Sequence, residues 1–185
     1  MSLLNDLLTK HDTDNRIWGH APVYEKHLDR ERVRRMLEIG IDAPHHVVAS
    51  LRAWRDYFPN ADIYGINNDA RFIYKDDRIE TVLCDAYDAQ QLAETIKSWR
   101  TPLFDFIRDN AMHDPLPQLH LCRMLWPVLA PGGIYAIEKA CPHKCPENSL
   151  EPMIELLTAM HPDMHATEYP THKEERLLIL QKALA

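Results

Sequence analysis

Several side chains that could do acid–base chemistry stand directly after short apolar segments of this chain. His113 follows Asp109, just beyond the apolar run that ends at Ile107. An imidazole with a pKa of about 6.5 can take a proton from a hydroxyl group as that group reacts. His113 is therefore a candidate general base, and a hydrogen-bonded position at the start of a helix is the alternative.

A second cluster of potential ligands is the segment Cys141-Pro142-His143-Lys144-Cys145. Thiols and an imidazole are ligands that suit zinc, and His120 and Cys122 could complete the set. The paired spacing that zinc sites commonly show is absent, however, so a proline-rich loop with incidental thiols is the favoured interpretation. A disulfide between Cys141 and Cys145 is a further alternative.

The elements that must position such residues are clearest around Gly40. Met36-Leu37-Glu38-Ile39-Gly40 is typical of a short buried strand, and a turn and a helix follow it. This unit opens nucleotide-binding α/β domains, in which further glycines normally let the backbone approach the ligand. Here Asp42-Ala43-Pro44-His45-His46 fills the turn, Pro44 restricts its backbone, and two imidazoles need space. We expect a turn that either closes the pocket or admits a different ligand.

Strands and helices alternate along the remaining chain, which predicts a parallel sheet with helices on both faces. The last two strands, separated by a short polar turn, predict an antiparallel hairpin. The expected strands are Arg35–Ile39, Asp62–Ile66, Ile79–Leu83, Phe104–Ile107, Ile134–Glu138, His165–Tyr169 and Arg176–Lys182, and the expected helices between them are His45–Phe58, Asp69–Lys75, Ala89–Trp99, Pro117–Leu129 and Leu150–Met160.

The totals indicate one domain over residues 1–185, with a helical N-terminal extension over residues 1–34. Ser2 is expected to cap a helix that runs to Lys10, and a second helix is expected over Pro22–Arg35. The composition, 45% hydrophobic and 26% charged, is ordinary for a globular protein. A net charge of -7 argues against a general nucleic-acid-binding protein.

The sequence contains neither a recognisable leader peptide nor an apolar run of about 20 residues, the length that spans a membrane. A cytoplasmic protein with reduced thiols is therefore expected. The predicted partner is a small molecule rather than nucleic acid or a membrane. The N-terminal helices could also pack on a second copy in a homo-oligomer.

Four segments together carry a resemblance to a known family. They are His11-Asp12-Thr13-Asp14 with His20 and Tyr24-Glu25, Leu37–Gly40 with Ser50–Trp54, Phe104–Ile107 with Asp109 and His113, and Leu129–Gly133 with Ile134–Glu138. These segments resemble class I S-adenosylmethionine-dependent methyltransferases, and more narrowly the sugar O-methyltransferases related to the macrocin and mycinamicin enzymes. The resemblance implies a Rossmann-like methyltransferase fold, with a mostly parallel seven-stranded sheet and a C-terminal antiparallel hairpin.

The resemblance implies that S-adenosylmethionine binds at Glu38, Gly40, Asn67 and Asp85. The family has an acidic residue at the position of Asn67, where a carboxylate accepts hydrogen bonds from both ribose hydroxyls. An amide oxygen can still accept, but without charge. Asp69 is an alternative acceptor that is also expected to cap the next helix, and a helix cap is the alternative role for Asp85.

At the neighbouring strand ends, the resemblance implies His113 as the general base, with Asp109 and Lys139 beside it in catalytic positions. The family's magnesium site needs carboxylates where this chain has Asn110 and Lys139, and magnesium prefers hard anionic oxygens. We therefore expect no magnesium site of the family type. Lys139 could supply the positive charge instead, paired with Glu138 or Asp109, or it could orient a substrate oxygen.

Arg108 stands where the branch has an apolar strand residue. A buried arginine needs a partner. We therefore expect Arg108 either at an exposed strand end or paired with Asp109 or Glu38, and the sequence leaves these alternatives open.

The resulting expectation is an S-adenosylmethionine-dependent O-methyltransferase-like protein that acts on a small hydroxylated acceptor, a sugar or natural product, without the family's magnesium. The substitutions at Asn67, Asn110 and Lys139 favour an alternative, a catalytically inactive protein that uses the same fold for binding or as a scaffold. A His/Cys metal-binding protein on this fold is a third interpretation.

Overall fold

One mixed sheet of eight strands organises the described part of the chain, in the order β3-β4-β2-β1-β5-β6-β8-β7. The computed structural model describes residues 2–13, 19–41, 48–100, 103–140, 149–170 and 176–184. The strands are β1 Arg35–Ile39, β2 Asp62–Asn67, β3 Lys75–Asp76, β4 Ile79–Leu83, β5 Phe104–Asp109, β6 Leu129–Ala140, β7 Met164–Pro170 and β8 Arg176–Lys182. Every strand expected from the sequence is present, and the short β3 is an addition.

The strands that carry the predicted site residues run in the same direction. β1 is parallel to β2 and β5, β2 is parallel to β4, and β5 is parallel to β6. β8 pairs antiparallel with β6 and β7, which confirms the predicted hairpin, and β3 is antiparallel to β4. The carboxyl ends of the parallel strands therefore meet at one edge of the sheet, where ligands bind in open α/β folds.

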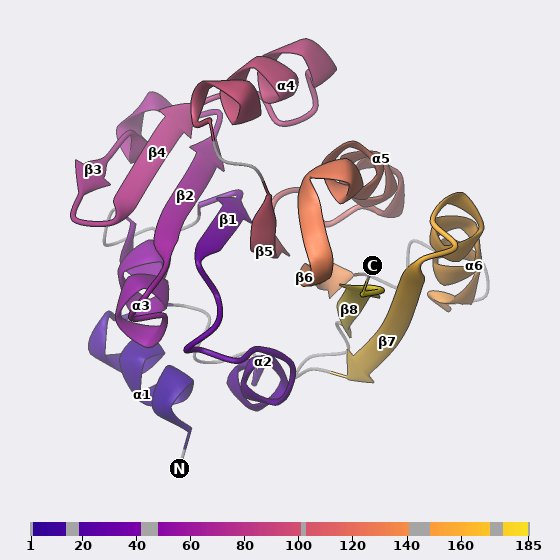
Figure 1. Cartoon of the computed structure of the whole chain (residues 1–185), viewed down its shortest axis with the longest axis horizontal. Coiled ribbons are helices and arrows are strands. Elements are labelled where there is room, and N and C mark those ends of the chain that lie inside the picture. The colour runs from indigo at the N-terminus through magenta and orange to yellow at the C-terminus, as the bar shows by residue number, and fades with distance from the viewer. Residues whose placement is uncertain are drawn as a thin grey trace.

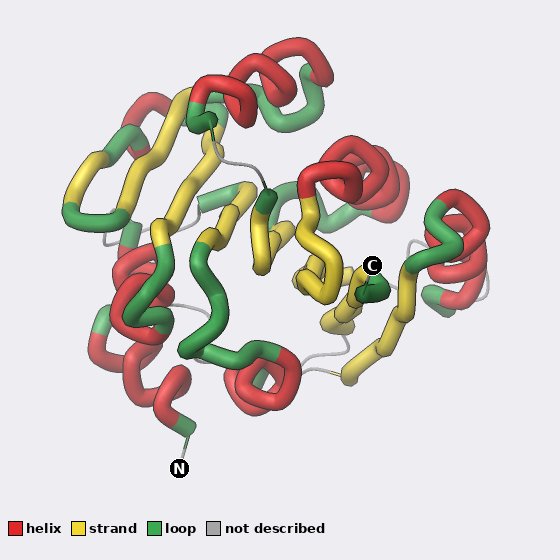
Figure 2. Tube along the Cα trace, viewed as in Figure 1, coloured by secondary structure: helices red, strands yellow, loops and turns green. Residues whose placement is uncertain are grey.

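The described α-helices cover both faces of the sheet, as Figure 1 and Figure 2 show. α1 (Leu3–Lys10), α2 (Ala21–His27) and α3 (Ala49–Tyr57) lie on one face, and α4 (Ala89–Ser98), α5 (Pro115–Leu125) and α6 (Glu151–Met160) lie on the other. A hydrophobic core lies on each face of the sheet. Because side chains alternate along a strand, Met36 of β1 belongs to the core on the side of α1–α3, and Leu37 belongs to the core on the side of α4–α6. Within the described ranges, no helix is long and apolar enough to cross a membrane.

The second helix is shorter than the predicted Pro22–Arg35. It ends at His27, because Leu28 adopts an extended backbone conformation and is buried in the core. Asp29 then accepts a hydrogen bond from the backbone N–H of Glu31 at 3.0 Å, which forms a turn in place of further helix. The following residues form the connection to β1.

The helix predicted over Asp69–Lys75 is also wrong. A 3-10 turn at Ala70–Phe72 and the strand β3 take its place. The Thr81 hydroxyl on β4 donates to the carbonyl oxygen of Phe72 at 2.7 Å. A contact with the neighbouring strand therefore decides the conformation of this segment.

The boundary between α5 and β6 also differs from the predicted helix Pro117–Leu129. The helix begins at Pro115, a 3-10 turn follows it at Trp126–Val128, and β6 begins at Leu129. Pro127 lies within that turn, and a proline has no N–H with which to continue a helix.

The turn after β1 depends on Gly40, which has a positive φ of 76°. A Cβ atom here would lie 2.6 Å from the Cα of Ala111 and 2.6 Å from the carbonyl oxygen of Asn110, both in the loop after β5. Only glycine permits this backbone conformation together with so close an approach. Gly40 therefore sets how closely the ends of β1 and β5 meet.

We expect Gly40→Ala to lower the free energy of unfolding by about 2–4 kcal/mol, because the new methyl group collides with backbone in a left-handed conformation. Gly132→Ala is the matched control, since Gly132 has the same φ of 76° but a Cβ there would meet the flexible Leu184 side chain. Urea denaturation measures both values. Equal losses in the two variants would contradict the close approach of the loops.

Candidate functional site

The sheet brings the predicted site residues to its carboxyl-terminal edge. β1 lies between β2 and β5, so residues that are far apart in the sequence share this region. The predicted residues at or just beyond these strand ends are Glu38, Gly40, Asn67, Asp85, Asp109, His113 and Lys139.

The loop after β5 is hydrogen-bonded to the end of β1 through Asn110. The backbone N–H of Asn110 donates to the carbonyl oxygen of Ile39 at 2.9 Å, and its side-chain amide donates to the carbonyl oxygen of Gly40 at 3.3 Å. The Asn110 side chain is almost fully buried. A carboxylate at this position could not donate the second bond, so the amide suits the close arrangement of the two loops.

Asn67 holds the next residue of the same turn. Its amide nitrogen donates to the carbonyl oxygen of Ile41 at 2.7 Å, and its amide oxygen accepts from the backbone N–H of Asp69 at 2.8 Å. Both polar ends of the side chain are thus engaged by the protein. A ligand hydroxyl would have to share the amide oxygen, which has a second lone pair.

The helix-capping role falls to Asp88 rather than to Asp85. Asp88 accepts from backbone N–H groups in the first turn of α4. Asp85 is exposed and accepts from the backbone N–H of Tyr87 at 2.9 Å, so its carboxylate is accessible to a ligand. Asp69 caps the 3-10 turn after β2, in agreement with the expected capping role.

Arg108 forms the electrostatic centre of this region. Its fully buried guanidinium donates from Nε and Nη2 to the two carboxylate oxygens of Glu138, at 2.8 and 2.7 Å. Its Nη1 lies 2.9 Å from Oε2 of Glu38. Of the alternatives that the sequence left open for Arg108, the structure selects a buried position paired with Glu38, and it adds Glu138.

Glu138 connects this centre to both faces of the sheet. The Tyr24 hydroxyl donates to Oε1 of Glu138 at 2.6 Å, and Nδ1 of His20 lies 3.2 Å from the same oxygen. On the other face, the Gln118 side chain donates to the backbone carbonyl oxygen of Glu138 at 3.3 Å. Burial alone would raise the pKa of the Glu138 carboxyl, but Arg108 and His20 outweigh burial and hold this pKa well below its ordinary value.

Glu38, the predicted cofactor contact on β1, is enclosed by the same centre. Its Oε1 accepts from the Ser50 hydroxyl of α3 at 2.7 Å, and its side chain is fully buried. Burial raises the pKa of the Glu38 carboxyl, against the opposing effects of Arg108 and Ser50. These contacts lie within the protein, so a role for Glu38 toward the cofactor remains a prediction.

Asp109 points to the opposite face of the sheet from Arg108, because neighbouring residues of a strand alternate. Its buried carboxylate accepts from the backbone N–H of Ala111 at 3.1 Å and from the Tyr135 hydroxyl at 3.2 Å. Burial raises the pKa of Asp109 to about 7 in spite of these hydrogen bonds. Asp109 therefore changes protonation near neutral pH, and its contacts orient the loop that leads to His113.

His113 lies in the loop after β5, and Lys139 lies near the end of β6. His113 is half-buried and precedes α5 by two residues. Lys139 follows Glu138 within β6 and has a positive φ of 50°. The catalytic roles of both residues remain predictions, and the described ion pairs of Glu138 include one with Arg108 at 2.7 Å.

Two features singled out from the sequence lie outside the described residues. They are the turn Asp42-Ala43-Pro44-His45-His46 and the segment that contains Cys141, His143 and Cys145. Cys84 and Cys122, which are described, are free and buried. Among the described residues, no three His, Cys, Asp or Glu side chains are grouped so that they could hold a metal ion.

The positions that the resemblance assigns to magnesium do not fit that ion. The amide nitrogen of Asn110 donates to Gly40 and its amide oxygen has no hydrogen-bond partner, but a neutral amide lacks the negative charge of the family's carboxylate. Glu138 already binds the guanidinium of Arg108 and the hydroxyl of Tyr24. Lys139 brings a further positive charge to the remaining position, so this donor set is unsuited to a hard divalent cation.

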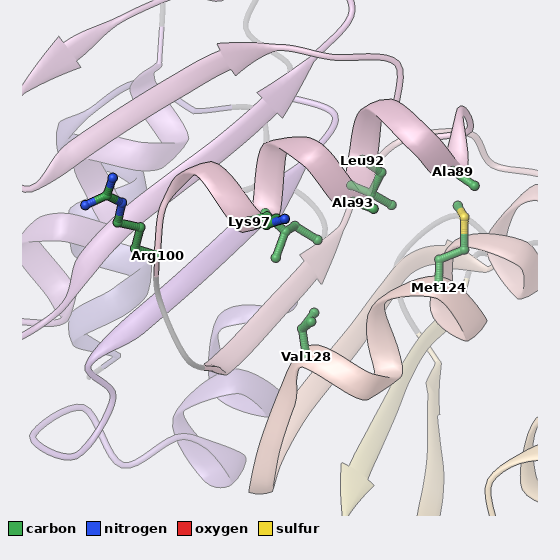
Figure 3. Close-up of a pocket in the computed structure, with 8 residues that line it drawn as sticks. Ala89, Leu92, Ala93, Lys97, Arg100, Met124 and Val128 are labelled. Carbon is green, nitrogen blue, oxygen red and sulfur yellow. The ribbon is translucent and has the colours of Figure 1, made fainter.

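A separate groove lies between α4 and α5 (Figure 3), and none of the predicted site residues lines it. Its volume is about 570 Å³. α4 contributes Leu92 and Lys97, and Met124 and Val128 lie on the other side. The groove is therefore distinct from the strand ends at which cofactor binding is expected.

Comparisons with known proteins agree with the fold and with the resemblance. The chain is 32% identical over 152 residues to the 8-demethyl-8-(2-methoxy-alpha-L-rhamnosyl)-tetracenomycin-C 3'-O-methyltransferase of Streptomyces olivaceus, over 77% of this chain and 38% of that protein. It is 32% identical over 145 residues to the demethylmacrocin O-methyltransferase of Streptomyces fradiae, over 73% of this chain and 35% of that protein. No family model matches the chain.

Among solved structures, the MycE methyltransferase from the mycinamycin biosynthetic pathway, in complex with Mg, SAH and mycinamycin VI, has a TM-score of 0.77. It is 25% identical, over 98% of this chain and 54% of that one. These comparisons show that the chain is similar in sequence and in fold to class I S-adenosylmethionine-dependent methyltransferases. The relatives are named as O-methyltransferases of sugar-bearing natural products, and the chain spans 35% to 47% of their length.

Sequence reasoning missed the pairing of Arg108 with Glu138 and the contacts of His20 and Tyr24. One signal was available in the expected strands. Glu38, Arg108 and Glu138 each stand two residues after an apolar residue that faces the same core. Charged residues on one face of neighbouring strands are close enough to pair once the order of the strands is known.

We expect Asn67→Asp to lower the free energy of unfolding by about 1–3 kcal/mol, because it replaces the donor to Ile41 with a carboxylate oxygen. Asn68→Asp is the matched control, since Asn68 is the exposed neighbour. Urea denaturation at neutral pH gives both values. If Asn67→Asp is as stable as Asn68→Asp, Asn67 does not hold the turn.

The raised pKa of Asp109 predicts a pH dependence of stability. The pKa is about 7 in the folded protein and about 3.9 in an unfolded chain, so between these values only the folded state retains the proton. This carboxyl therefore reduces stability progressively as the pH rises from about 4 to about 7. Asp109→Asn cannot ionise, and its stability advantage over the wild type should be roughly 2–3 kcal/mol larger at about pH 8 than at about pH 5.

Urea denaturation at the two pH values measures this difference. Asp105→Asn, at the other end of β5, is the control for exchanging a carboxylate on the same strand. A stability of Asp109→Asn that follows the wild-type pH dependence would contradict the raised pKa.

Proposed function

We propose that this chain acts as an S-adenosylmethionine-dependent O-methyltransferase on a hydroxyl group of a small acceptor, a sugar or another natural product. The observation that supports this most is the convergence of Gly40, Asn67, Asp85 and His113 at one edge of the sheet. The named relatives act on sugar-bearing tetracenomycin and on demethylmacrocin and mycinamicin VI, which supports an acceptor of that class.

The residues proposed to bind the cofactor keep part of the chemistry that it requires. Gly40 presents backbone without a side chain, Asp85 presents an exposed carboxylate, and Asn67 retains one lone pair on its amide oxygen. When bound, S-adenosylmethionine supplies an electrophilic methyl group. Glu38 supports the turn from within the protein through Ser50 and Arg108.

His113 is proposed to take the proton of the acceptor hydroxyl. That proton must leave as the oxygen gains a methyl group, and a neutral imidazole is a suitable acceptor near pH 7. Asp109 positions the intervening loop through the backbone N–H of Ala111. Lys139 is proposed to stabilise the negative charge that develops on the acceptor oxygen.

A second candidate function is that of a catalytically inactive binding or scaffold protein. The observation that favours it is the pair of amide hydrogen bonds from Asn67 and Asn110 to the carbonyl oxygens of Ile41 and Gly40. These bonds hold the turn after β1 from two sides. In this alternative the turn stays closed and the protein binds no S-adenosylmethionine.

Calorimetric titration with S-adenosylmethionine and S-adenosylhomocysteine, with and without magnesium, separates the two candidates. We expect dissociation constants of about 1–100 μM that do not depend on magnesium. Asp85→Asn should weaken binding about tenfold, by removing the charge that accepts hydrogen bonds from the ligand. No binding of either ligand by the folded protein would contradict the proposal and favour the scaffold.

His113→Ala tests the proposed base in a screen of hydroxylated acceptors. Methyl transfer should fall by about 10²–10⁴-fold while the affinity for S-adenosylhomocysteine is retained. His120→Ala is the matched control, because His120 is an exposed histidine of α5. A rate for His113→Ala equal to that of the control would exclude His113 as the base.

A further inference from the structure

We propose that the Arg108 guanidinium is a built-in cation that takes the place of a divalent metal ion at Glu138. The carboxylates at the centre of the sheet are then held together without magnesium. This inference concerns the metal alone, and it stands whether or not the chain transfers methyl groups.

The first argument is the geometry of the three charged side chains. Glu38, Arg108 and Glu138 come from the neighbouring strands β1, β5 and β6, and their relative exposures are 0%, 0% and 1%. The guanidinium makes two parallel hydrogen bonds to Glu138, at 2.8 and 2.7 Å, and an ion pair of 2.9 Å to Glu38. A planar guanidinium is the side chain that can bind two carboxylates in this way.

The second argument is the balance of charge. Two carboxylates buried side by side repel each other and have lost their hydration, so both can stay ionised only if a positive group lies between them. A divalent cation is one solution that proteins use, and the solved relative MycE is in complex with Mg. Arg108 supplies the positive charge from within the chain, at a position fixed by the register of β1 and β5.

The third argument is that the carboxylate oxygens of Glu138 and Glu38, which a metal would need, already have partners. Oε1 of Glu138 accepts from Arg108 and Tyr24 and lies 3.2 Å from Nδ1 of His20, and Oε2 accepts from Arg108. Oε1 of Glu38 accepts from Ser50. A metal ion could enter only by displacing a guanidinium that is fully buried and hydrogen-bonded.

The first experiment titrates manganese, which accepts the same oxygen ligands as magnesium and is counted by electron paramagnetic resonance. The manganese-binding curves of the wild type and of Glu138→Gln are compared, because manganese bound elsewhere on the protein contributes equally to both curves. We expect identical curves. A manganese site in the wild type that Glu138→Gln abolishes would overturn the proposal.

The second experiment removes the internal cation in Arg108→Met. The melting temperature should fall by about 10 °C, because two carboxylates are left without a counter-charge. Magnesium or manganese chloride should restore part of the loss, whereas potassium chloride at equal ionic strength should not. The wild type should not respond. If Arg108→Met folds and neither divalent ion raises its melting temperature, the proposal is overturned.

The double variant Arg108→Met/Glu138→Gln is the matched control. It removes one of the two charges together with the guanidinium, so it should melt above Arg108→Met and show no response to magnesium. If Arg108→Met does not fold, recovery of a folded protein in this double variant supports the charge argument. Failure of the double variant to improve on the single variant, or a magnesium response as large as that of the single variant, would overturn it.

Discussion

The pairing of Arg108 with Glu138 and Glu38 is the interaction on which the centre of this structure depends. It joins β1, β5 and β6 from a fully buried position. Removing such charges from water costs several kcal/mol for each ion, and the opposite charges and the hydrogen bonds within the cluster offset this cost. The Tyr24 hydroxyl of α2 donates to Glu138, and the Ser50 hydroxyl of α3 donates to Glu38. Both helices are therefore hydrogen-bonded to this cluster.

The same constraint shapes the candidate site at the strand ends. The carboxylates of Glu38 and Glu138 both pair with Arg108. The turn after β1 is held by neutral donors instead, the side-chain amides of Asn67 and Asn110. Asp109 lies on the other face of the sheet, where burial raises its pKa to about 7 and outweighs the opposing effects of its hydrogen bonds and of Arg108. Arg108 and Asp109, which are consecutive in β5, thus have different electrostatic environments. Arg108 faces the carboxylates of Glu38 and Glu138, whereas Asp109 faces the apolar core on the other side of the sheet.

Most of the fold could be predicted because its signals are local. Apolar runs bounded by turns predict the bounds of β1, β4 and β8 as the structure has them, and Ser2 caps α1 as expected. The predictions are wrong where a contact with a residue far away in the sequence determines the local conformation. Leu28 leaves the helix because the core buries it, and Thr81 of β4 hydrogen-bonds the segment near Phe72 that has helical character in the sequence alone.

The sequence by itself determined the α/β topology, and with it the collection of Gly40, Asn67, Asp85 and His113 at one edge, because parallel strands always bring their carboxyl ends together. The tertiary structure alone decided how those residues are engaged. The partner of Arg108 depends on which strands are neighbours and which face each side chain shares. The role of Asn67 depends on where the carbonyl oxygen of Ile41 lies. Both are relations between segments far apart in the chain, and no local pattern encodes them.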